Sequence, residues 1–258
     1  MEKVIFLGNG PLAEYALAVL KSKCQVIFHA RTKADLEIVK KMKTAHPEAH
    51  GVLASFGVVI KKDLLDLFEP EGILNIHPSK LPLLRGASPI ESAILAGETS
   101  FSVSVMKLAT ELDAGPIYYQ KTLDNLPIDK LKIYQALAET GAEWIAANLT
   151  ALPEPLKQDE NKATFCSKLT KPMGILTPET DNAETTLRKI VALQGFPKPK
   201  YKFFGLSCII LKAHITEPEE KPALIIPCAD GHSVTVEELQ PEGRKAMDAK
   251  SFLNGYAK

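Results

Sequence analysis

The sequence predicts an α/β protein in which a doubly wound, Rossmann-like parallel sheet domain precedes a smaller, OB-like β-barrel domain. In the first 150 residues, apolar runs that begin near positions 3, 24, 51 and 72 alternate with segments of helical apolar spacing. Strands and helices that alternate in this way form right-handed βαβ units around a parallel sheet. After position 178, the runs LSCIILKAHI, PALIIPCAD and HSVTVEEL are short and interrupted by Pro and Gly, a spacing typical of a small barrel.

The expected strands are apolar runs bounded by polar or turn-forming residues, at 3–7, 24–28, 51–60, 72–78, 100–108 and 115–123. The expected helices show apolar residues at helical spacing, from the GNGPLA turn through Leu20, then up to about Lys43, and at 61–68, 89–96, 129–148 and 180–193. Prolines among polar residues between positions 152 and 178 predict a linker. We therefore expect a first domain at 1–160, a linker at 161–178 and a C-terminal domain at 179–258.

The composition is that of an average globular protein: of 258 residues, 45% are hydrophobic and 24% are charged. These values exclude disorder, collagen-like repeats and a coiled coil, and no run approaches the ~20 apolar residues of a membrane span. The N-terminus lacks the build of a secretory signal, so we expect a cytoplasmic monomer with no membrane partner. The four cysteines form no C-x-x-C pair, which predicts reduced thiols and no metal site.

A net charge of zero, from 31 basic and 31 acidic residues, conceals a local pattern. Residues 168–258 hold 13 basic and 11 acidic residues, whereas residues 1–167 hold 18 and 20. Within 186–204, TLRKIVALQGFPKPKYKFF, there are five basic residues and no acid. Basic residues interleaved with aromatic ones suit binding to a nucleic acid backbone, although Phe203 and Phe204 fit a protein core equally well.

The turn GNGPLA after the first expected strand matches G-x-G-x-x-A, a dinucleotide-binding pattern. The second strand ends in His29, Ala30 and Arg31 rather than in the acidic residue that would hold a ribose. Arg31 could instead contact a 2′-phosphate, which keeps an NADP-dependent oxidoreductase as an alternative. A structural turn in a doubly wound sheet is the simpler interpretation.

Asn75 and His77 lie two positions apart at the end of the fourth expected strand, so both side chains point to the same side of the backbone. Ligands of parallel sheets bind at the carboxyl ends of the strands. Asp113 lies in a turn between two later strands. A single histidine next to a proline is more often structural, so the surrounding motifs decide the interpretation.

Those motifs resemble the folate-dependent formyltransferases, in particular the members that act on methionyl-tRNA. NIHPSKLPLLRGASPIESAILAG (75–97) is similar to the family's N-x-H-x-S-x-L-P-x-x-R-G-A-x-P-I, and ELDAGPI (111–117) to its L-D-x-G turn. LQPEGRKAMDAKSFLNGY (239–256) resembles the C-terminal motif, and TFCSKLTKPMGIL (164–176) the segment between the domains. The resemblance covers nearly the whole chain, and its C-terminal motif points to the tRNA branch.

The resemblance implies transfer of the formyl group of 10-formyltetrahydrofolate to the amino group of methionyl-initiator tRNA, with Asn75, His77 and Asp113 as catalytic residues. The reaction passes through a tetrahedral oxyanion, for which an Asn amide and a protonated imidazole are suitable donors. A carboxylate at Asp113 would favour the imidazolium and orient its ring, or hold a water that relays protons. Ser102 and Ser104 have no G-x-S-x-G context, so we expect no serine nucleophile.

The resemblance further assigns folate binding to Ser79, Lys80, Leu81 and Pro82, where Lys80 replaces the family's usual Leu. The related enzymes have a basic, proline-containing loop after the second strand that enters the tRNA acceptor stem, and here FHARTKADLEIVKKMK (28–43) lacks it. The basic residues that we expect to contact tRNA are Arg31, Arg188, Lys198, Lys200 and Lys202.

Two further alternatives remain open from the sequence. An amino-sugar nucleotide formyltransferase shares the Asn-His-Asp set and does without the tRNA loop, but the motif LQPEGRKAM favours the tRNA enzyme. A catalytically inactive RNA-binding protein is the other, and the presence of all three catalytic residue types argues against it.

Overall fold

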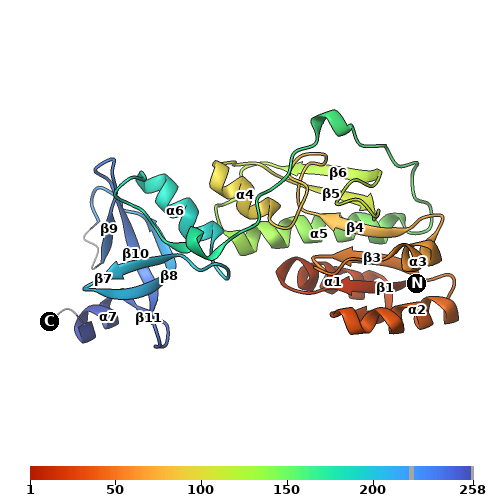
Figure 1. Cartoon of the computed structure of the whole chain (residues 1–258), viewed down its shortest axis with the longest axis horizontal. Helices are drawn as coiled ribbons and strands as arrows, with labels where there is room; N and C mark the ends of the chain where they lie inside the picture. The colour runs from red at the N-terminus through yellow and green to blue at the C-terminus, as the bar shows by residue number, and fades with distance from the viewer. Residues whose placement is uncertain (221–223, 257–258) are drawn as a thin grey trace. The chain divides into compact units, whose positions relative to one another are not determined.

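A computed structural model describes residues 1–220 and 224–256, which fold into two compact units. The first unit comprises residues 1–90 and 99–167, and the second comprises residues 91–98 and the described residues from 168 to 256 (Figure 1).

The first unit is built on a six-stranded sheet with the order β2-β1-β3-β4-β5-β6. Its strands are β1 (Lys3–Gly8), β2 (Gln25–Ala30), β3 (His50–Ala54), β4 (Ile73–His77), β5 (Phe101–Lys107) and β6 (Ile117–Leu123). The helices of this part of the chain are α1 (Pro11–Lys23), α2 (Leu36–Ala45), α3 (Lys62–Leu65), α4 (Pro89–Ala96) and α5 (Lys130–Asn148). The Rossmann-like α/β prediction is therefore confirmed.

Strands β1 to β4 pair in parallel, whereas β4 pairs with β5, and β5 with β6, in antiparallel fashion. The sheet is thus mixed rather than wholly parallel. The chain passes from β5 to β6 through residues 108–116, and a connection without a helix can join antiparallel strands but not parallel ones. This turn contains Asp113 and brings it next to β4.

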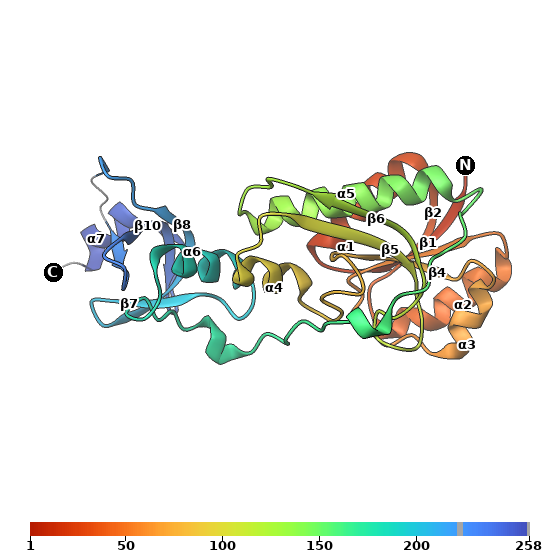
Figure 2. The same ribbon diagram turned by 90° about the horizontal axis from the view of Figure 1, so that it is seen from above.

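Helices cover both faces of the sheet (Figure 2). Helices α1 and α5 pack against each other on one face, and α5 contacts β4 and β5. The other face carries α2 and α3, over a core in which Ile5, Leu53 and Ile73 are almost fully buried. Because β4 is central, all five of its residues are buried, as expected for a strand covered on both faces.

The apolar run 51–60, expected as one strand, leaves the sheet after Ala54. Ser55 and Gly57 adopt φ angles of 48° and 67°, left-handed conformations that end an extended strand. Residues 55–60 therefore lie beyond the carboxyl end of β3.

The GNGPLA turn has a structural explanation. A Cβ atom on Gly8 would lie 2.1 Å from the carbonyl oxygen of Ala54, so only glycine allows β1 and β3 to approach at this point. Gly10 has a φ of 79° immediately before α1, a conformation that glycine adopts without strain.

The second unit is a five-stranded antiparallel sheet of order β11-β10-β8-β7, with β9 paired to β10. Its strands are β7 (Lys200–Phe203), β8 (Leu206–Ile215), β9 (Ile225–Pro227), β10 (Ser233–Pro241) and β11 (Met247–Asp248), and its helices are α6 (Ala183–Ala192) and α7 (Ala249–Tyr256). Asn182 begins α6 by accepting a hydrogen bond from the Thr185 amide. Ile190 and Phe252 are fully buried in a core shared with β8 and β10. The curled antiparallel sheet confirms the predicted C-terminal fold.

Within the part of the chain that the structure describes, no helix combines the length and apolar character needed to cross a membrane. The four cysteines form no disulfide bond there, and Cys24 and Cys208 are buried. No group of three His, Cys, Asp or Glu side chains among the same residues could hold a metal ion.

Candidate active site

Strand β4 presents Asn75 and His77 on one side at its carboxyl end. Both residues are buried, each with 5% of its surface exposed. His77 is the last residue of β4 and lies opposite Ser104 of β5. Asn75 is therefore positioned by pairing with both β3 and β5, and His77 by pairing with β5.

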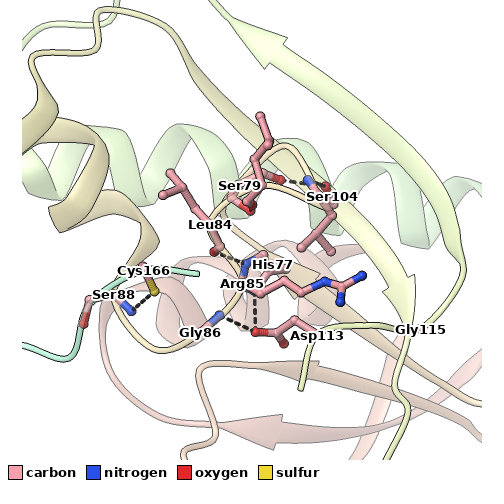
Figure 3. A network of polar contacts seen from close by, with 12 residues as sticks. His77, Ser79, Leu84, Arg85, Gly86, Ser88, Ser104, Asp113, Gly115 and Cys166 are labelled. Carbon is pink, nitrogen blue, oxygen red and sulfur yellow. Dashed lines mark hydrogen bonds and ion pairs between the residues drawn. The ribbon is translucent and has the colours of Figure 1, made fainter. Parts of the chain in front are cut away.

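His77 lies between a carboxylate and a backbone carbonyl (Figure 3). Its Nδ1 atom is 3.7 Å from Asp113 Oδ2, and its Nε2 atom is 3.2 Å from the carbonyl oxygen of Leu84. A carbonyl oxygen only accepts hydrogen bonds, so Nε2 bears a proton and Nδ1 faces the carboxylate. Asp113 Oδ2 also accepts a hydrogen bond of 2.8 Å from the Gly86 amide.

Burial lowers the pKa of His77 below its ordinary value, although the Asp113 carboxylate and the Leu84 carbonyl both raise it. The side chain is only 6% exposed, and removal from water disfavours the charged ring. Burial outweighs the charge of Asp113, and a histidine pKa below its ordinary value favours the neutral imidazole at pH 7.

A cavity of about 500 Å³ opens beside these residues, with Asn75, His77 and Asp113 in its lining. Two segments that the sequence analysis did not single out supply much of the remaining wall, residues 55–60 and 108–112. Val59 and Leu112 are 84% and 62% exposed although apolar. Their exposure beside a cavity indicates a surface suited to an apolar ring system.

The four residues predicted to bind folate do not line this cavity. Ser79 and Leu81 are buried, at 4% and 2% exposure, whereas Lys80 is exposed. The Ser79 hydroxyl donates to the carbonyl oxygen of Leu83 at 2.6 Å. Their contacts thus shape the 78–84 loop, with Pro82 at half-burial within it.

Ser104, on β5, hydrogen-bonds to the backbone of the 78–84 loop. Its hydroxyl is fully buried, donates to the carbonyl of Ser79 and accepts from the amide of Leu81, at 2.6 and 3.1 Å. Gln120 donates to the same hydroxyl and to the Leu81 carbonyl. The Ser104 hydroxyl is therefore engaged in fixing the loop that carries Leu84, the partner of His77.

A second cavity, of about 850 Å³, lies within the second unit and is lined by Lys198, Lys200 and Lys202. Strand alternation gives Lys200 and Lys202 the same face of β7, while Phe203 is buried in the core at 7% exposure. Phe196, 51% exposed, also lines the cavity, together with Lys171 and a single acid, Glu179.

The two arginines predicted to contact tRNA are not among the residues that line that cavity. Arg31 is exposed just after β2, where its amide donates to Asp35 Oδ2. Arg188 is half-buried on α6 and donates to the hydroxyl of Thr185. The chain passes from β2 to α2 through residues 31–35, consistent with the missing basic loop.

Comparison with known proteins identifies the family. Residues 9–149 match the formyl transferase family, and residues 168–257 match the formyl transferase C-terminal domain. The chain belongs to the formyl transferase family, and its fold and conserved domain pair are those of a formyl-transfer enzyme. This assignment argues against the oxidoreductase interpretation of the GNGPLA turn.

The relatives agree with this assignment. A methionyl-tRNA formyltransferase of Granulibacter bethesdensis is 35% identical over 80% of this chain and 67% of its own length. The methionyl-tRNA formyltransferase structure from Clostridium thermocellum shares the fold, with a TM-score of 0.69 and 19% identity over 93% of this chain and 98% of that one. HypX from Aquifex aeolicus, in complex with tetrahydrofolic acid, has a TM-score of 0.77 and 18% identity over all of this chain, which spans 48% of HypX.

Proposed function

We propose that this chain transfers the formyl group of 10-formyltetrahydrofolate to the amino group of methionyl-initiator tRNA. The observation that supports this most directly is the set of Asn75, His77 and Asp113 in one cavity wall of a formyl transferase domain. Relatives named methionyl-tRNA formyltransferase support the choice of acceptor.

In the proposed mechanism, His77 accepts a proton and Asn75 donates a hydrogen bond. The attacking amine must lose a proton, and the neutral His77 ring can accept it at Nδ1, 3.7 Å from Asp113 Oδ2. The Asp113 carboxylate then stabilises the imidazolium, which gives the proton to N10 of the folate as the bond between N10 and the formyl carbon breaks. The Asn75 amide lines the same cavity and can donate to the negative charge that develops on the formyl oxygen.

The 500 Å³ cavity suits the bicyclic head of the folate. It combines apolar side chains, such as Phe56 and Leu112, with the polar groups of Asn75 and Asp113 at its wall. An apolar pocket with a few convergent polar groups is the usual form of a small-molecule site. The folate supplies the activated formyl group, and these residues would hold it against the end of β4.

The tRNA would bind through exposed positive charge, with Lys198, Lys200 and Lys202 contacting phosphates and Arg31 and Arg188 adding weaker contributions. Phe196 offers an exposed ring beside these lysines. In this proposal the enzyme is a cytoplasmic monomer with a catalytic domain at 1–160, a linker at 161–178 and a tRNA-binding domain at 179–258.

A competition between acceptors tests this proposal. The purified chain would be mixed with 10-formyltetrahydrofolate and either methionyl-initiator tRNA or a dTDP-linked amino sugar, and formylated product would be measured by mass spectrometry. We expect product on the tRNA. Product on the amino sugar alone would overturn the assignment in favour of a sugar formyltransferase.

A further inference from the structure

Gln158 lies on a segment that follows α5 and runs along the catalytic loop. Leu156 exchanges two backbone hydrogen bonds of 2.8 Å with Ile117 at the start of β6. A few residues later, Thr164 accepts from the Arg85 amide at 2.8 Å. Gln158 is thus fixed between two anchored points, and its side chain is buried, with the residue 5% exposed.

The Gln158 amide group joins the two parts of the chain that hold His77. Its Nε2 atom donates to the carbonyl oxygens of Asp113 and Gly115, at 2.8 and 2.7 Å. Its Oε1 atom accepts from Arg85 Nε and Nη2, at 3.1 and 2.7 Å. Both donors and both acceptor positions are used, so the amide has a single orientation.

The same contacts form a closed path around the catalytic pair. Asp113 Oδ2 accepts from the amide of Gly86, the residue after Arg85. Arg85, 2% exposed, is held from its outer side by two hydrogen bonds of 2.8 Å to Glu160. Gln158 therefore connects the backbone at Asp113 to the side chain of Arg85. The residue after Arg85, Gly86, in turn binds the Asp113 carboxylate.

The backbone at Asp113 shows why such a connection matters. Asp113 has a φ of 50°, a left-handed conformation that is uncommon outside glycine, although Asp adopts it more readily than most residues. The two Gln158 hydrogen bonds fall on the carbonyls at this left-handed turn. Without them, the turn is free to relax and the carboxylate to move away from His77 Nδ1.

We propose that Gln158 is a positioning residue of this enzyme, which acts through Asp113 by fixing the carboxylate against the His77 ring. This inference rests on the proposed formyl transfer. The Asp113 charge counteracts the effect of burial on the His77 pKa, so displacement of the carboxylate leaves a ring that gains a proton less readily.

The first test follows His77 itself, in the purified chain without substrates. In protein with ¹⁵N-labelled histidine, NMR titration measures the His77 pKa in the parent and in Gln158→Met, an apolar replacement of similar length. We expect a lower His77 pKa in Gln158→Met. An unchanged value would contradict the proposal, and this readout remains valid if the formyl acceptor is a different molecule.

The second test is a double-mutant cycle in the formylation assay. Gln158→Met should lower kcat about 10-fold and change the KM for 10-formyltetrahydrofolate less than about 2-fold, since the residue acts on the reacting groups and not on the folate. In an Asp113→Asn background the same substitution should cost less than about 2-fold. Equal losses in both backgrounds would show that Gln158 does not act through Asp113.

Gln194 supplies a matched control. This half-buried glutamine donates to the carbonyl oxygen of Leu211 at 2.9 Å, within the second unit. Gln194→Met should therefore lower thermal stability without moving the His77 pKa. If Gln158→Met fails to fold, Gln158→Glu keeps the oxygen that accepts from Arg85 Nε and Nη2 but replaces the donor with a charged oxygen that repels the carbonyls of Asp113 and Gly115, so it should still reduce kcat. An unreduced kcat in Gln158→Glu would refute the role of the Gln158 donor.

Discussion

The two cavities of this protein use charge in opposite ways. In the first unit the charged and polar groups are buried and hold one another: His77 lies between Asp113 and Leu84, and Asp113 binds the Gly86 amide. In the second unit the lysines that line the cavity are exposed or half-buried, and Lys200 Nζ lies 3.9 Å from Glu242 Oε1. Chemistry on one formyl group requires fixed atoms, whereas contact with phosphates requires only accessible charge. The two regions should therefore respond differently to substitution.

The largest expected effect is that of His77→Ala. Loss of the ring removes the proposed proton acceptor, and we expect the rate of formyl transfer to fall about 10³-fold, with about 10²-fold for Asn75→Ala. Single-turnover formylation of methionyl-tRNA would measure this. The dissociation constant for tRNA should remain within about 2-fold of the parent value, since His77 is buried and the proposed tRNA contacts are made by lysines. Retained turnover in His77→Ala would refute its role.

Asp113→Asn tests the electrostatic part of the first site. The carboxylate raises the pKa of His77 against the lowering effect of burial, so a neutral amide should lower that pKa further. The acid limb of the kcat/KM profile, which follows protonation of the free enzyme, should move to lower pH. We expect kcat at neutral pH to fall about 10²-fold, because the imidazolium loses its partner. An acid limb that moves to higher pH would contradict the assigned pair.

Charge reversal in the second unit should affect binding alone. The triple variant Lys198→Glu, Lys200→Glu and Lys202→Glu should weaken tRNA binding about 30-fold at low salt and reduce the salt slope of binding by up to about 3. Filter binding over a series of salt concentrations measures both quantities. Lys245→Glu, an exposed lysine outside the cavity lining, is the matched control. An unchanged salt slope in the triple variant would exclude these lysines from the tRNA site.

The smallest effects separate the two sets of residues considered for folate binding. Leu112 is 62% exposed and lines the first cavity, so Leu112→Ser should raise the KM for 10-formyltetrahydrofolate about 10-fold by removing apolar contact area. Lys80 is exposed and lies outside that lining. Lys80→Ala should change the same KM less than about 2-fold. A larger rise in KM for Lys80→Ala than for Leu112→Ser would instead support folate binding by the 79–82 segment.

The sequence was sufficient for the fold class, because apolar spacing is a local feature. The assignment of Asn75, His77 and Asp113 came from the resemblance to the formyltransferase motifs, and their catalytic roles stay a prediction. The sequence did not indicate the cavity walls at 55–60 and 108–112. Both segments are mainly apolar. Residues 55–60 leave the sheet at the left-handed backbone of Ser55 and Gly57, and residues 108–112 belong to the connection between β5 and β6. Gln158 was missed for a related reason: it meets Asp113 across 45 positions of sequence, and no local pattern marks such a contact.

The mixed sheet was a further difference. Apolar alternation identified the strands at 100–108 and 115–123, but strand direction depends on how the chain returns, and the sequence pattern of a strand does not encode it. The antiparallel pairing of β5 with β4 also places Ser104 within hydrogen-bond distance of the 78–84 loop. The direction of one strand thus fixes the surroundings of His77.

The central claim, that fixed groups in the first unit perform the chemistry while lysines in the second unit bind tRNA, is tested most directly by one measurement. The single-turnover rate of formylation would be recorded against tRNA concentration, at saturating 10-formyltetrahydrofolate, for the parent, His77→Ala and the triple lysine variant. The account predicts that the triple variant regains the parent rate at saturating tRNA, whereas His77→Ala does not at any concentration. A triple variant that stays slow at saturation, or a His77→Ala variant that recovers, would contradict it.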